Sequence, residues 1–505
     1  MATRAAARGD VLVAIDVGTS GARAAAIDLQ GRRIAETRRP YPTSSPRPSW
    51  AEQDPRAWRS AALGALADLV RTIEDPAASR VRAIGLTGQC PSVCLVDEAG
   101  DPVRPGLIYR DNRAADEAAA MRVRFGAEAL HERTGHLAAG FHIAPKLLWI
   151  RRHEPEAFAR ARWMLQPRDL VAFALTGEIA TDGTHAAATL LYDLRSGDWA
   201  PDLVAALDID PRLLPPIRSS WVPVGELAAS VARRVGLRPG MPVVLGGADS
   251  QACALGAGVI APGPVSEMAG SSTCLNAAVL EPLDVLEVTH YPHVIEGPYT
   301  TETGINTTGA AVGWLADLVY DGRRGRARAA DYARLDAEAA VVPAGADGVQ
   351  LLPVLADGER TDPDLRAAIT GLSLRHGRAT LARAALEGVA FAIRAQLDLL
   401  ARGGAPPTDL RVSGGDARLT TWNRVKADVA GLPVRTIPGD AATTGVAMLA
   451  GLGAGIYRDP AEAIAACVHP DPPIEPDPAV RTRYDQAFRA HLELAAAVVV
   501  RRSEV

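Results

Sequence analysis

Apolar and polar positions alternate along this chain in short runs separated by glycine-rich loops, a pattern typical of a mixed α/β protein. Two apolar runs near the start, 11–15 and 24–29, flank such a loop and predict a β-hairpin meander. A strand, a turn of small residues and a second strand recur over 264–279, which predicts an internal repeat. The stretch 57–72 predicts a helix.

Three further predicted strands each run directly into a polar loop. They lead, in chain order, from 81–86 to Gln89-Cys90-Pro91, from 243–245 to Gly246-Gly247-Ala248-Asp249, and from 410–412 to Ser413-Gly414-Gly415-Asp416. Ligand sites of α/β proteins usually form where strands end in this way. The third loop precedes a predicted helix, so it suits the ribose or phosphates of a nucleotide, although a plain β-to-α turn fits the pattern equally well.

Length and composition set the organisation. A chain of 505 residues exceeds what one core usually supports, and we predict a boundary that divides it into domains 1–244 and 245–505. A net charge of -5 gives no sign of attraction to nucleic acid or to a membrane. The five scattered cysteines form neither a disulfide framework nor a zinc motif, so we expect a cytoplasmic protein.

The first glycine-rich loop, Asp16-Val17-Gly18-Thr19-Ser20-Gly21, has the chemistry of a phosphate site. Its glycines allow close backbone approach, and its hydroxyl and amide groups can bind phosphate oxygens. A carboxylate at Asp16 beside phosphates would need a cation, which implies Mg²⁺. An ordinary hairpin with a glycine-rich turn is an equally open interpretation of this loop alone.

Two common nucleotide motifs are excluded or weak. Lys146 and Lys426 are the only lysines, and neither follows a glycine-rich turn at the start of a helix, so the chain has no P-loop. The segment Gly256-Ala257-Gly258 begins a G-x-G-x-x-A match, but a helix of small residues, and not a strand, is predicted before it. Any ATP site must therefore use another scaffold.

Taken together, these motifs resemble the FGGY carbohydrate kinases over nearly the whole chain and in the family's order. The resemblance rests on Asp16 to Ser20, Trp50 to Pro55, Asp111-Asn112-Arg113, Ala144 to Trp149, Gly246 to Asp249, Gly358-Glu359-Arg360, Leu386-Glu387-Gly388 and Ser413 to Arg418. It implies two domains of ribonuclease H-like fold, related to actin and the Hsp70 ATPases, with a ligand cleft between them.

The resemblance also implies an ATP-dependent sugar kinase that uses Mg²⁺. The xylulokinase branch is the most similar, so the expected acceptor is a ketopentose, D-xylulose, which would become D-xylulose 5-phosphate. Two alternatives stay open: a family kinase for another polyol, ketose, deoxysugar or sugar acid, and an actin-like or Hsp70-like ATPase without a sugar substrate. A sugar and ATP are the expected partners, and a homodimer is a further expectation.

By the resemblance, Asp249 is expected to be the catalytic base and Asp16 to act on Mg²⁺ and the γ-phosphate, with both carboxylates near the metal. The residues expected to bind the nucleotide are Gly18, Thr19, Ser20, Gly270, Ser271, Ser272, Gly414, Gly415, Asp416 and Thr444. Those expected to bind the sugar are Gln89, Cys90, Pro91, Asp111, Asp249 and Ser250.

Departures from the xylulokinase pattern gather in the expected sugar site. Cys90-Pro91 stands where that branch usually carries Met-His, and Ser250 stands where asparagine is usual. An imidazole and an amide that could hydrogen-bond sugar hydroxyls are therefore missing. Because lost polar partners change which hydroxyls are bound, ATP binding is expected to survive better than close recognition of xylulose.

Overall fold

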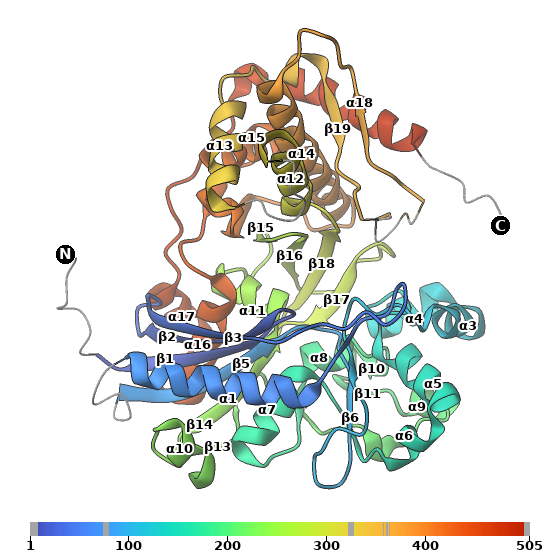
Figure 1. Cartoon of the computed structure of the whole chain (residues 1–505), viewed down its shortest axis with the longest axis vertical. Helices are drawn as coiled ribbons and strands as arrows, with labels where there is room; N and C mark the ends of the chain where they lie inside the picture. Colours follow the sequence, from blue (N-terminus) through green and yellow to red (C-terminus); the bar gives the residue numbers. More distant parts are fainter. Residues whose placement is uncertain are drawn as a thin grey trace. The chain divides into compact units, whose positions relative to one another are not determined.

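The computed structural model describes residues 9–73, 80–321, 328–356, 358–359, 362 and 364–498. The chain forms two compact units, and each is built from separate stretches of sequence (Figure 1). The first unit takes Met1–Ile260, Leu280–Thr301 and Asp440–Val468, and the second takes Ala261–Val279, Glu302–Gly439 and His469–Val505. The boundary between residues 244 and 245 stays a prediction.

The first unit is organised around a six-stranded sheet with the strand order β13-β14-β5-β1-β2-β3. Strands β1, β2 and β3 form the predicted antiparallel meander, while β5 and β14 lie parallel to β1. The strands span Val11–Val17 (β1), Gly21–Asp28 (β2), Arg33–Pro40 (β3), Val81–Gly88 (β5), Pro223–Glu226 (β13) and Pro242–Ala248 (β14).

Both faces of the central strands β1, β2, β5 and β14 are buried, as the apolar strand β1 requires. Val11, Val13 and Ile15 pack into one core cluster with Trp58 of helix α1, whereas Leu12 packs on the opposite face with residues of helix α16. Figure 1 shows α1 and α7 along one face and α11 and α16 along the other. These four helices span Pro55–Thr72 (α1), Pro167–Thr176 (α7), Asp249–Gly256 (α11) and Ala441–Gly453 (α16).

Smaller elements complete the first unit. Its other helices are α3 (Ala115–Phe125), α4 (Ala127–Thr134), α5 (Ile143–His153), α6 (Pro155–Arg160), α8 (Gly183–Ala187), α9 (Pro201–Ala206), η1 (Pro211–Leu213), α10 (Ala229–Val235) and α17 (Pro460–Cys467). Its short strands are β4 (Glu52–Gln53), β6 (Cys94–Val96), β7 (Gly106–Leu107), β8 (Trp163–Leu165), β9 (Thr181–Asp182), β10 (Tyr192–Asp193), β11 (Asp198–Trp199), β12 (Ile217–Arg218) and β17 (Thr289–Pro292).

The sheet of the second unit repeats the central pattern of the first. Its strands run in the order β18-β16-β15-β21-β22, with β16 antiparallel to β15, and with β15, β21 and β22 mutually parallel. They span Pro264–Ala269 (β15), Thr273–Val279 (β16), Tyr299–Ile305 (β18), Asp409–Gly414 (β21) and Val434–Thr436 (β22). The order β18-β16-β15-β21-β22 corresponds to β3-β2-β1-β5-β14, so the predicted internal repeat is confirmed.

Helices pack around this second sheet, and the long helix α14 contacts α12, α13, α15 and α18. The remaining elements of the unit are α12 (Gly309–Ala316), η2 (Asp317–Asp321), α13 (Ala329–Ala339), η3 (Ala346–Gly348), β19 (Gln350–Leu352), β20 (Ala368–Thr370), α14 (Arg378–Arg402), η4 (Asp416–Arg418), α15 (Thr420–Ala430), η5 (Pro478–Val480) and α18 (Arg481–Ala497).

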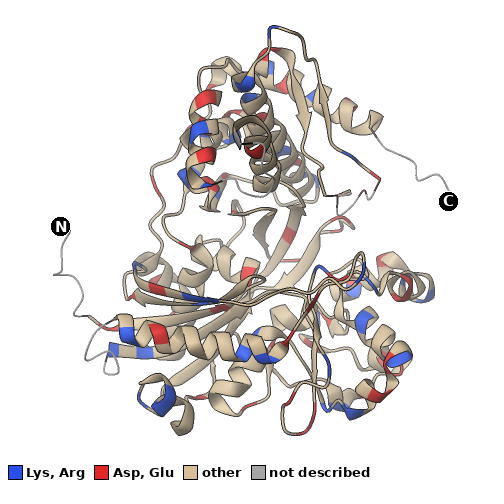
Figure 2. Ribbon diagram, in the orientation of Figure 1, with Lys and Arg blue, Asp and Glu red and all other residues tan. Residues whose placement is uncertain are grey.

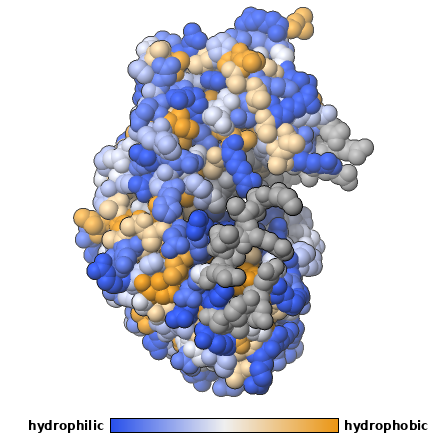
Figure 3. Space-filling view, turned by 90° about the vertical axis from the view of Figure 1, so that its left-hand side faces the viewer, coloured by the Kyte–Doolittle hydropathy of each residue, from blue (hydrophilic) through white to orange (hydrophobic). Residues whose placement is uncertain are grey.

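Acidic and basic residues are interspersed over the helices of each unit (Figure 2). The face seen in Figure 3 is mostly hydrophilic, with apolar side chains in scattered groups. Among the described residues, no helix is both long enough and apolar enough to cross a membrane.

Candidate functional site

Three neighbouring parallel strands of the first unit end side by side, and each leads into a predicted site loop. Val17 at the end of β1 and Ala248 at the end of β14 both align with Gly88 at the end of β5. Asp16, Gln89 and Asp249 are therefore gathered at one edge of the sheet. The carboxyl ends of parallel strands are where α/β proteins bind ligands, so this edge is the candidate active site of the unit.

Asp16 belongs to a chain of alternating charges. Its Oδ2 lies 3.1 Å from Nη2 of Arg23, whose Nη1 lies 2.6 Å from Oδ2 of Asp440. Loss of solvation on burial raises the pKa of Asp16, against the attraction of Arg23. Burial also disfavours the Asp440 carboxylate, but Arg23 and hydrogen bonds from Thr443 outweigh it and lower its pKa. The Arg23 cation thus ties the first loop to the start of α16.

The first loop is also tied to the predicted sugar residue Gln89. The Gln89 side-chain amide donates to the carbonyl of Gly18 (3.4 Å) and to Oε1 of Gln53 (2.9 Å). Gln53 in turn donates to the carbonyl of Thr19 (2.6 Å), and Tyr41 donates to the carbonyl of Gly18. These side chains fix the carbonyls of Gly18 and Thr19 by hydrogen bonds, and the amide groups of such a loop are the groups that could bind an anion.

Asp249 begins helix α11 directly after Ala248, the last residue of strand β14. Gly246 has φ +64, and a Cβ added there would lie 1.9 Å from the carbonyl oxygen of Leu86, so only glycine fits this position. Asp249 is the first residue of α11, and its Oδ1 accepts the backbone amide of Ser250 at 2.8 Å. A carboxylate in the first turn of a helix is stabilised by the helix dipole.

The predicted sugar loop follows a cis peptide bond between Cys90 and Pro91. Cys90 is partly exposed, and buried Pro91 lies close to the Lys146 ammonium, which donates to the carbonyl of Ile108 at 2.8 Å. Asp111 is fully buried, and its carboxylate accepts hydrogen bonds from the Arg113 guanidinium and from the amide of Ala51. Its contacts in this structure are thus to the protein's own framework.

Four of the six predicted nucleotide residues of the second unit, Gly270, Ser271, Gly415 and Asp416, line one cavity of about 440 Å³. Ala269 at the end of β15 aligns with Gly414 at the end of β21, which places both loops at the same edge of the second sheet. The cavity is lined by Gly270, Ser271, Gly309, Ala329, Tyr332, Ala333, Gly415, Asp416, Arg418 and Leu419. A cavity of this size with mixed apolar and polar walls suits a nucleoside.

Asp416 in this cavity is part of a buried charge cluster. Nζ of Lys426 lies 2.6 Å from Oε1 of Glu267 and 3.2 Å from Oδ2 of Asp416. Burial raises the pKa of both carboxyl groups, and the shared lysine opposes that rise. The buried lysine thus holds Asp416 in its place in the cavity wall.

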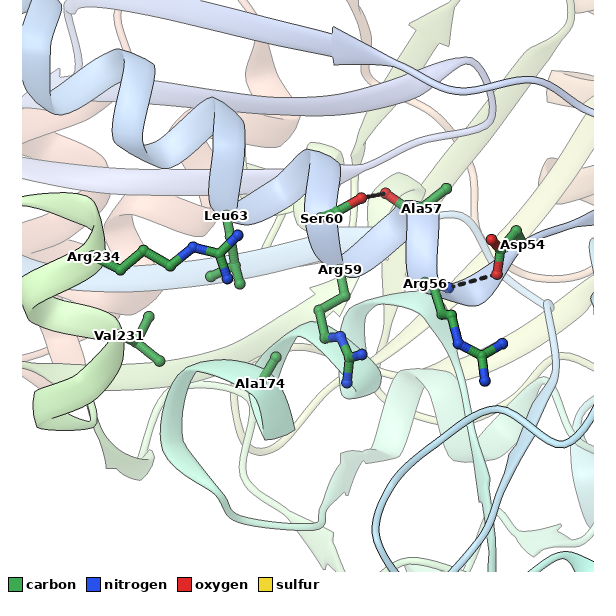
Figure 4. Close-up of a pocket in the computed structure, with 9 residues that line it drawn as sticks. All are labelled: Asp54, Arg56, Ala57, Arg59, Ser60, Leu63, Ala174, Val231 and Arg234. Carbon is green, nitrogen blue, oxygen red and sulfur yellow. Dashed lines mark hydrogen bonds between the residues drawn. The ribbon is translucent and has the colours of Figure 1, made fainter.

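A separate hollow of about 610 Å³ on the first unit contains none of the predicted site residues (Figure 4). Arg56, Arg59 and Ser60 of α1 line it together with Ala174 of α7 and Arg234 of α10. The sheet edge with Asp16 and Asp249, and not this hollow, is therefore where the candidate chemistry gathers.

The structure divides the predicted site residues between the units. Asp16, Gly18, Thr19, Ser20, Gln89, Cys90, Pro91, Asp111, Asp249, Ser250 and Thr444 lie in the first, and Gly270, Ser271, Ser272, Gly414, Gly415 and Asp416 lie in the second. Thr444 lies in the first turn of α16, where its amide donates to the carbonyl of Asp440. Arg360 of the family pattern lies outside the described residues.

Sequence reasoning missed the Arg23–Asp440 connection. Arg23 stands in a strand and Asp440 stands more than 400 positions later, so no local motif joins them. The available signal was the Asp-x-x-Thr start of α16, where Oδ1 of Asp440 accepts the amide of Thr443 as a helix cap.

Comparisons with known proteins agree with this arrangement. The model of the N-terminal domain of the FGGY family of carbohydrate kinases matches residues 11–256, and the model of its C-terminal domain matches residues 266–454. The chain is 31% identical to the xylulose kinase of Escherichia coli, over 83% of this chain and 84% of that protein. It is also 31% identical to the glycerol kinase of Gloeobacter violaceus, over 92% of each.

The structure is similar to the crystal structure of xylulose kinase from Rhodospirillum rubrum, with a TM-score of 0.88, 35% identity, and coverage of 96% of this chain and 98% of that one. The two α/β units thus have the fold of this kinase family, which is that of actin and the Hsp70 ATPases. The chain therefore belongs to the FGGY family of carbohydrate kinases and is itself a carbohydrate kinase.

Proposed function

We propose that this enzyme transfers the γ-phosphoryl group of ATP to a hydroxyl of a ketopentose, and that D-xylulose is the acceptor and D-xylulose 5-phosphate the product. The observation that carries the proposal is the alignment of Asp16, Gln89 and Asp249 at the ends of three adjacent parallel strands. It gathers a phosphate loop, a buried amide and a second carboxylate at one edge. The xylulose kinase relatives support the choice of acceptor.

Asp249 is proposed as the base that accepts the proton of the attacking hydroxyl. A carboxylate is too weak a base to ionise an alcohol beforehand, so the proton moves late, as the oxygen bonds to phosphorus. Most of the acceleration then comes from placing the hydroxyl in line with the phosphoryl group and from neutralising charge. Gln89, Cys90, Pro91, Asp111 and Ser250 are proposed to surround the sugar.

Nucleotide-binding residues are proposed for each unit by itself. The amides of Thr19 and Ser20 would bind phosphate oxygens, and Gly18, whose own amide donates to the carbonyl of Gly21, would allow the phosphates to approach. The cavity beside Ser271 and Asp416 in the second unit would take the nucleoside. Gly270, Ser272, Gly414 and Gly415 are proposed to complete this site of the second unit, and Thr444 is proposed as a nucleotide-binding residue of the first unit. The support is the convergence of Gly270, Ser271, Gly415 and Asp416 on one cavity.

Asp16 and Asp249 are proposed to hold Mg²⁺. Among the described residues, no group of three or more histidine, cysteine or acidic side chains could bind a metal ion. Mg²⁺ is commonly held by one or two carboxylates together with phosphate oxygens and water, so these two residues fit it. Their strands flank β5, which sets their backbones roughly 9.5 Å apart, a span that phosphate groups can share. Bound Mg²⁺ would neutralise phosphate charge.

A different acceptor is the second candidate. The glycerol kinase relative is as similar in sequence as the xylulose kinase of E. coli, and Cys90-Pro91 carries no imidazole. Glycerol, other polyols, ketoses, deoxysugars and sugar acids therefore belong in the test.

The test is a coupled ADP-release assay with ATP and Mg²⁺ over a panel of these acceptors. The proposal expects the highest kcat/KM with D-xylulose. A higher kcat/KM with another acceptor would move the assignment to that compound. Steady ATP hydrolysis that no acceptor stimulates would instead indicate an ATPase of the actin or Hsp70 type.

Replacement of Asp249 by alanine should lower kcat at least ~100-fold, because the proton loses its acceptor. The dissociation constant of ATP, measured by calorimetry without Mg²⁺, should change less than about threefold, since Asp249 is proposed to reach the nucleotide only through the metal ion. Retained turnover would show that another group is the base.

The assembly and location of the enzyme are also open to measurement. A homodimer and a cytoplasmic location both remain predictions from the sequence. Light scattering coupled to size-exclusion chromatography gives the mass in solution, and a mass near 53.0 kDa would contradict the dimer.

A further inference from the structure

Strand β14 runs directly into Asp249, and its last four residues, 245–248, which are called the turn below, are each held by a hydrogen bond. Each residue from 245 to 248 has a backbone carbonyl or amide fixed by a group from elsewhere in the first unit. The contacts are Arg168 Nη1 to the carbonyl of Leu245 (2.7 Å), the amide of Gly246 to the carbonyl of Ser220 (2.7 Å), Thr87 Oγ1 to the carbonyl of Gly247 (2.7 Å), and the amide of Ala248 to Thr184 Oγ1 (2.9 Å).

Three of these contacts come from one buried cluster around Asp182. Oδ1 of Asp182 lies 2.5 Å from Nη2 of Arg168, and Oδ2 accepts hydrogen bonds from Oγ1 of Thr184 (2.7 Å) and Oγ of Ser220 (3.0 Å). Asp182, Arg168 and Thr184 are all fully buried. A single carboxylate thus orients the guanidinium and the hydroxyl that reach the turn.

We propose that Asp182, Arg168 and Thr184 are positioning residues that fix the place of the Asp249 carboxylate for proton transfer. The inference rests on the proposed function, in which Asp249 is the base. None of the three needs to touch the substrate, because each acts through the backbone of residues 245–248.

The charge state of the cluster suits this role. Burial disfavours the Asp182 carboxylate, but Arg168 and hydrogen bonds from His185 and Thr184 outweigh it, so the pKa of Asp182 lies below its usual value. The carboxylate therefore stays ionised and keeps accepting both hydrogen bonds. Thr184 is left with one orientation, in which it donates to Asp182 and accepts from Ala248.

The geometry explains why loss of one hydroxyl would be felt at the site. Valine at position 184 keeps the shape of threonine but removes the acceptor of the Ala248 amide. The turn must then leave that amide without its partner or shift toward another one. A shift of about 1 Å in a catalytic group can cost on the order of 100-fold in rate.

Thr189 offers a matched control in the same unit. Its hydroxyl is equally buried, donates to the carbonyl of Ala186 (2.6 Å) and accepts the amide of Leu191 (3.0 Å). Neither partner belongs to the turn. Thr189→Val therefore removes a comparable buried hydroxyl without touching residues 245–248.

The experiment compares Thr184→Val, Thr184→Ser and Thr189→Val in the full-length enzyme, with kcat expressed per mole of folded protein and KM measured for ATP and sugar. Thr184→Val should lower kcat roughly 10- to 100-fold while both KM values stay within about threefold. Thr184→Ser, which keeps the hydroxyl, should recover kcat to within about threefold of the parent, and Thr189→Val should stay in that range.

Equal changes in kcat for Thr184→Val and Thr189→Val would overturn the inference, because they would indicate a general effect of a lost buried hydroxyl. If Thr184→Val does not fold, Ser220→Ala decides, since it removes only the hydrogen bond to Oδ2 of Asp182. It should lower kcat about threefold at unchanged KM, and an unaltered kcat would overturn the inference. Loss of activity in Asp249→Ala beside a fully active Thr184→Val would reject the positioning role alone.

Discussion

Lysine occurs at only two positions of this chain, and both side chains are fully buried. Lys146 lies against the predicted sugar loop, and burial lowers its pKa to about 7, although Asp111 attracts the charged form. Lys426 lies beneath the predicted nucleoside cavity, where Glu267 and Asp416 overcome burial and raise its pKa. The folded structure therefore shifts the pKa values of the two lysines in opposite directions.

Between pH 7 and about 10.5, unfolded Lys146 binds a proton that the folded protein releases. The free energy of unfolding should therefore rise with pH in this window, by at most about 1.4 kcal/mol per pH unit from this residue. Lys146→Met should lack that contribution. Urea unfolding of both proteins at pH 7, 8 and 9 measures the difference, and parallel pH profiles would contradict the prediction.

Lys426→Met should lower the free energy of unfolding by about 3–5 kcal/mol, because Glu267 and Asp416 lose the cation that compensates their burial. The double variant Lys426→Met with Glu267→Gln should lose less, since one buried carboxyl group becomes neutral. Denaturant unfolding at pH 7 measures both. A loss below about 1 kcal/mol in the single variant would show that the cluster is not held by its lysine.

Individual site residues were predictable where a local motif carries them. Gly18, Gly246 and Asp249 stand in short runs whose glycines already indicate tight turns, and the structure places these runs at strand ends. Arg23, Arg168 and Thr184 were not predictable, because each acts on a loop far away in sequence. Only the folded sheet brings their side chains next to these loops.

At the scale of elements, helices α11 and α16 cross with almost no space between their backbones. A Cβ added to Gly256 would lie 1.8 Å from the carbonyl oxygen of Ala441, and one added to Gly445 would lie 2.0 Å from that of Ala252. The G-x-G segment that begins at Gly256 therefore lies at a helix crossing and does not form a dinucleotide loop. The helix of small residues predicted before Gly256 is confirmed as α11.

Gly256→Ala should force α11 away from α16 and lower the free energy of unfolding by more than about 2 kcal/mol, as overpacked cores do. Because α11 begins with Asp249, kcat should fall as well. Gly377→Ala is the control, since a Cβ there meets nothing within 4 Å and its φ is negative. Thermal unfolding and the kinase assay compare the two variants, and equal melting temperatures would refute this account of the crossing.

Most of the longer elements followed from periodicity. The predicted helices 57–72 and 420–430 correspond to α1 and α15, and the predicted strands near 264–279 correspond to β15 and β16. The short strand β8 did not follow from periodicity. Three residues are too few to show a period, and β8 exists because it pairs with β6.

At the scale of the whole molecule, one topology is used twice, and each compact unit is built from separate stretches of the chain. The first unit includes residues 280–301 and 440–468, which follow the first stretch of the second unit in the sequence. Sequence patterns reveal the repeat, because each copy carries its own hairpin and parallel strands. Sequence patterns do not reveal that a late segment of the chain belongs to the first unit. This depends on helix α16, which packs on the sheet that contains β1.

A chain that ends at Gly439 should therefore fail to fold its first unit. It would lack α16, which packs on β1, β5 and β14 and buries Leu12 and Val244. The exposed apolar face should bind the dye ANS and promote aggregation. A monomeric, cooperatively unfolding product with native circular dichroism would contradict this expectation.

The late position of α16 in the sequence also determines when the sheet of the first unit can be covered during synthesis. Strand β1 leaves the ribosome early, yet the helix that covers one of its faces is translated only after the second sheet is complete. Throughout most of elongation, the nascent chain thus carries an uncovered apolar layer, which is the kind of surface that molecular chaperones bind. We therefore expect chaperones to cover this apolar layer of the nascent kinase until α16 has been made.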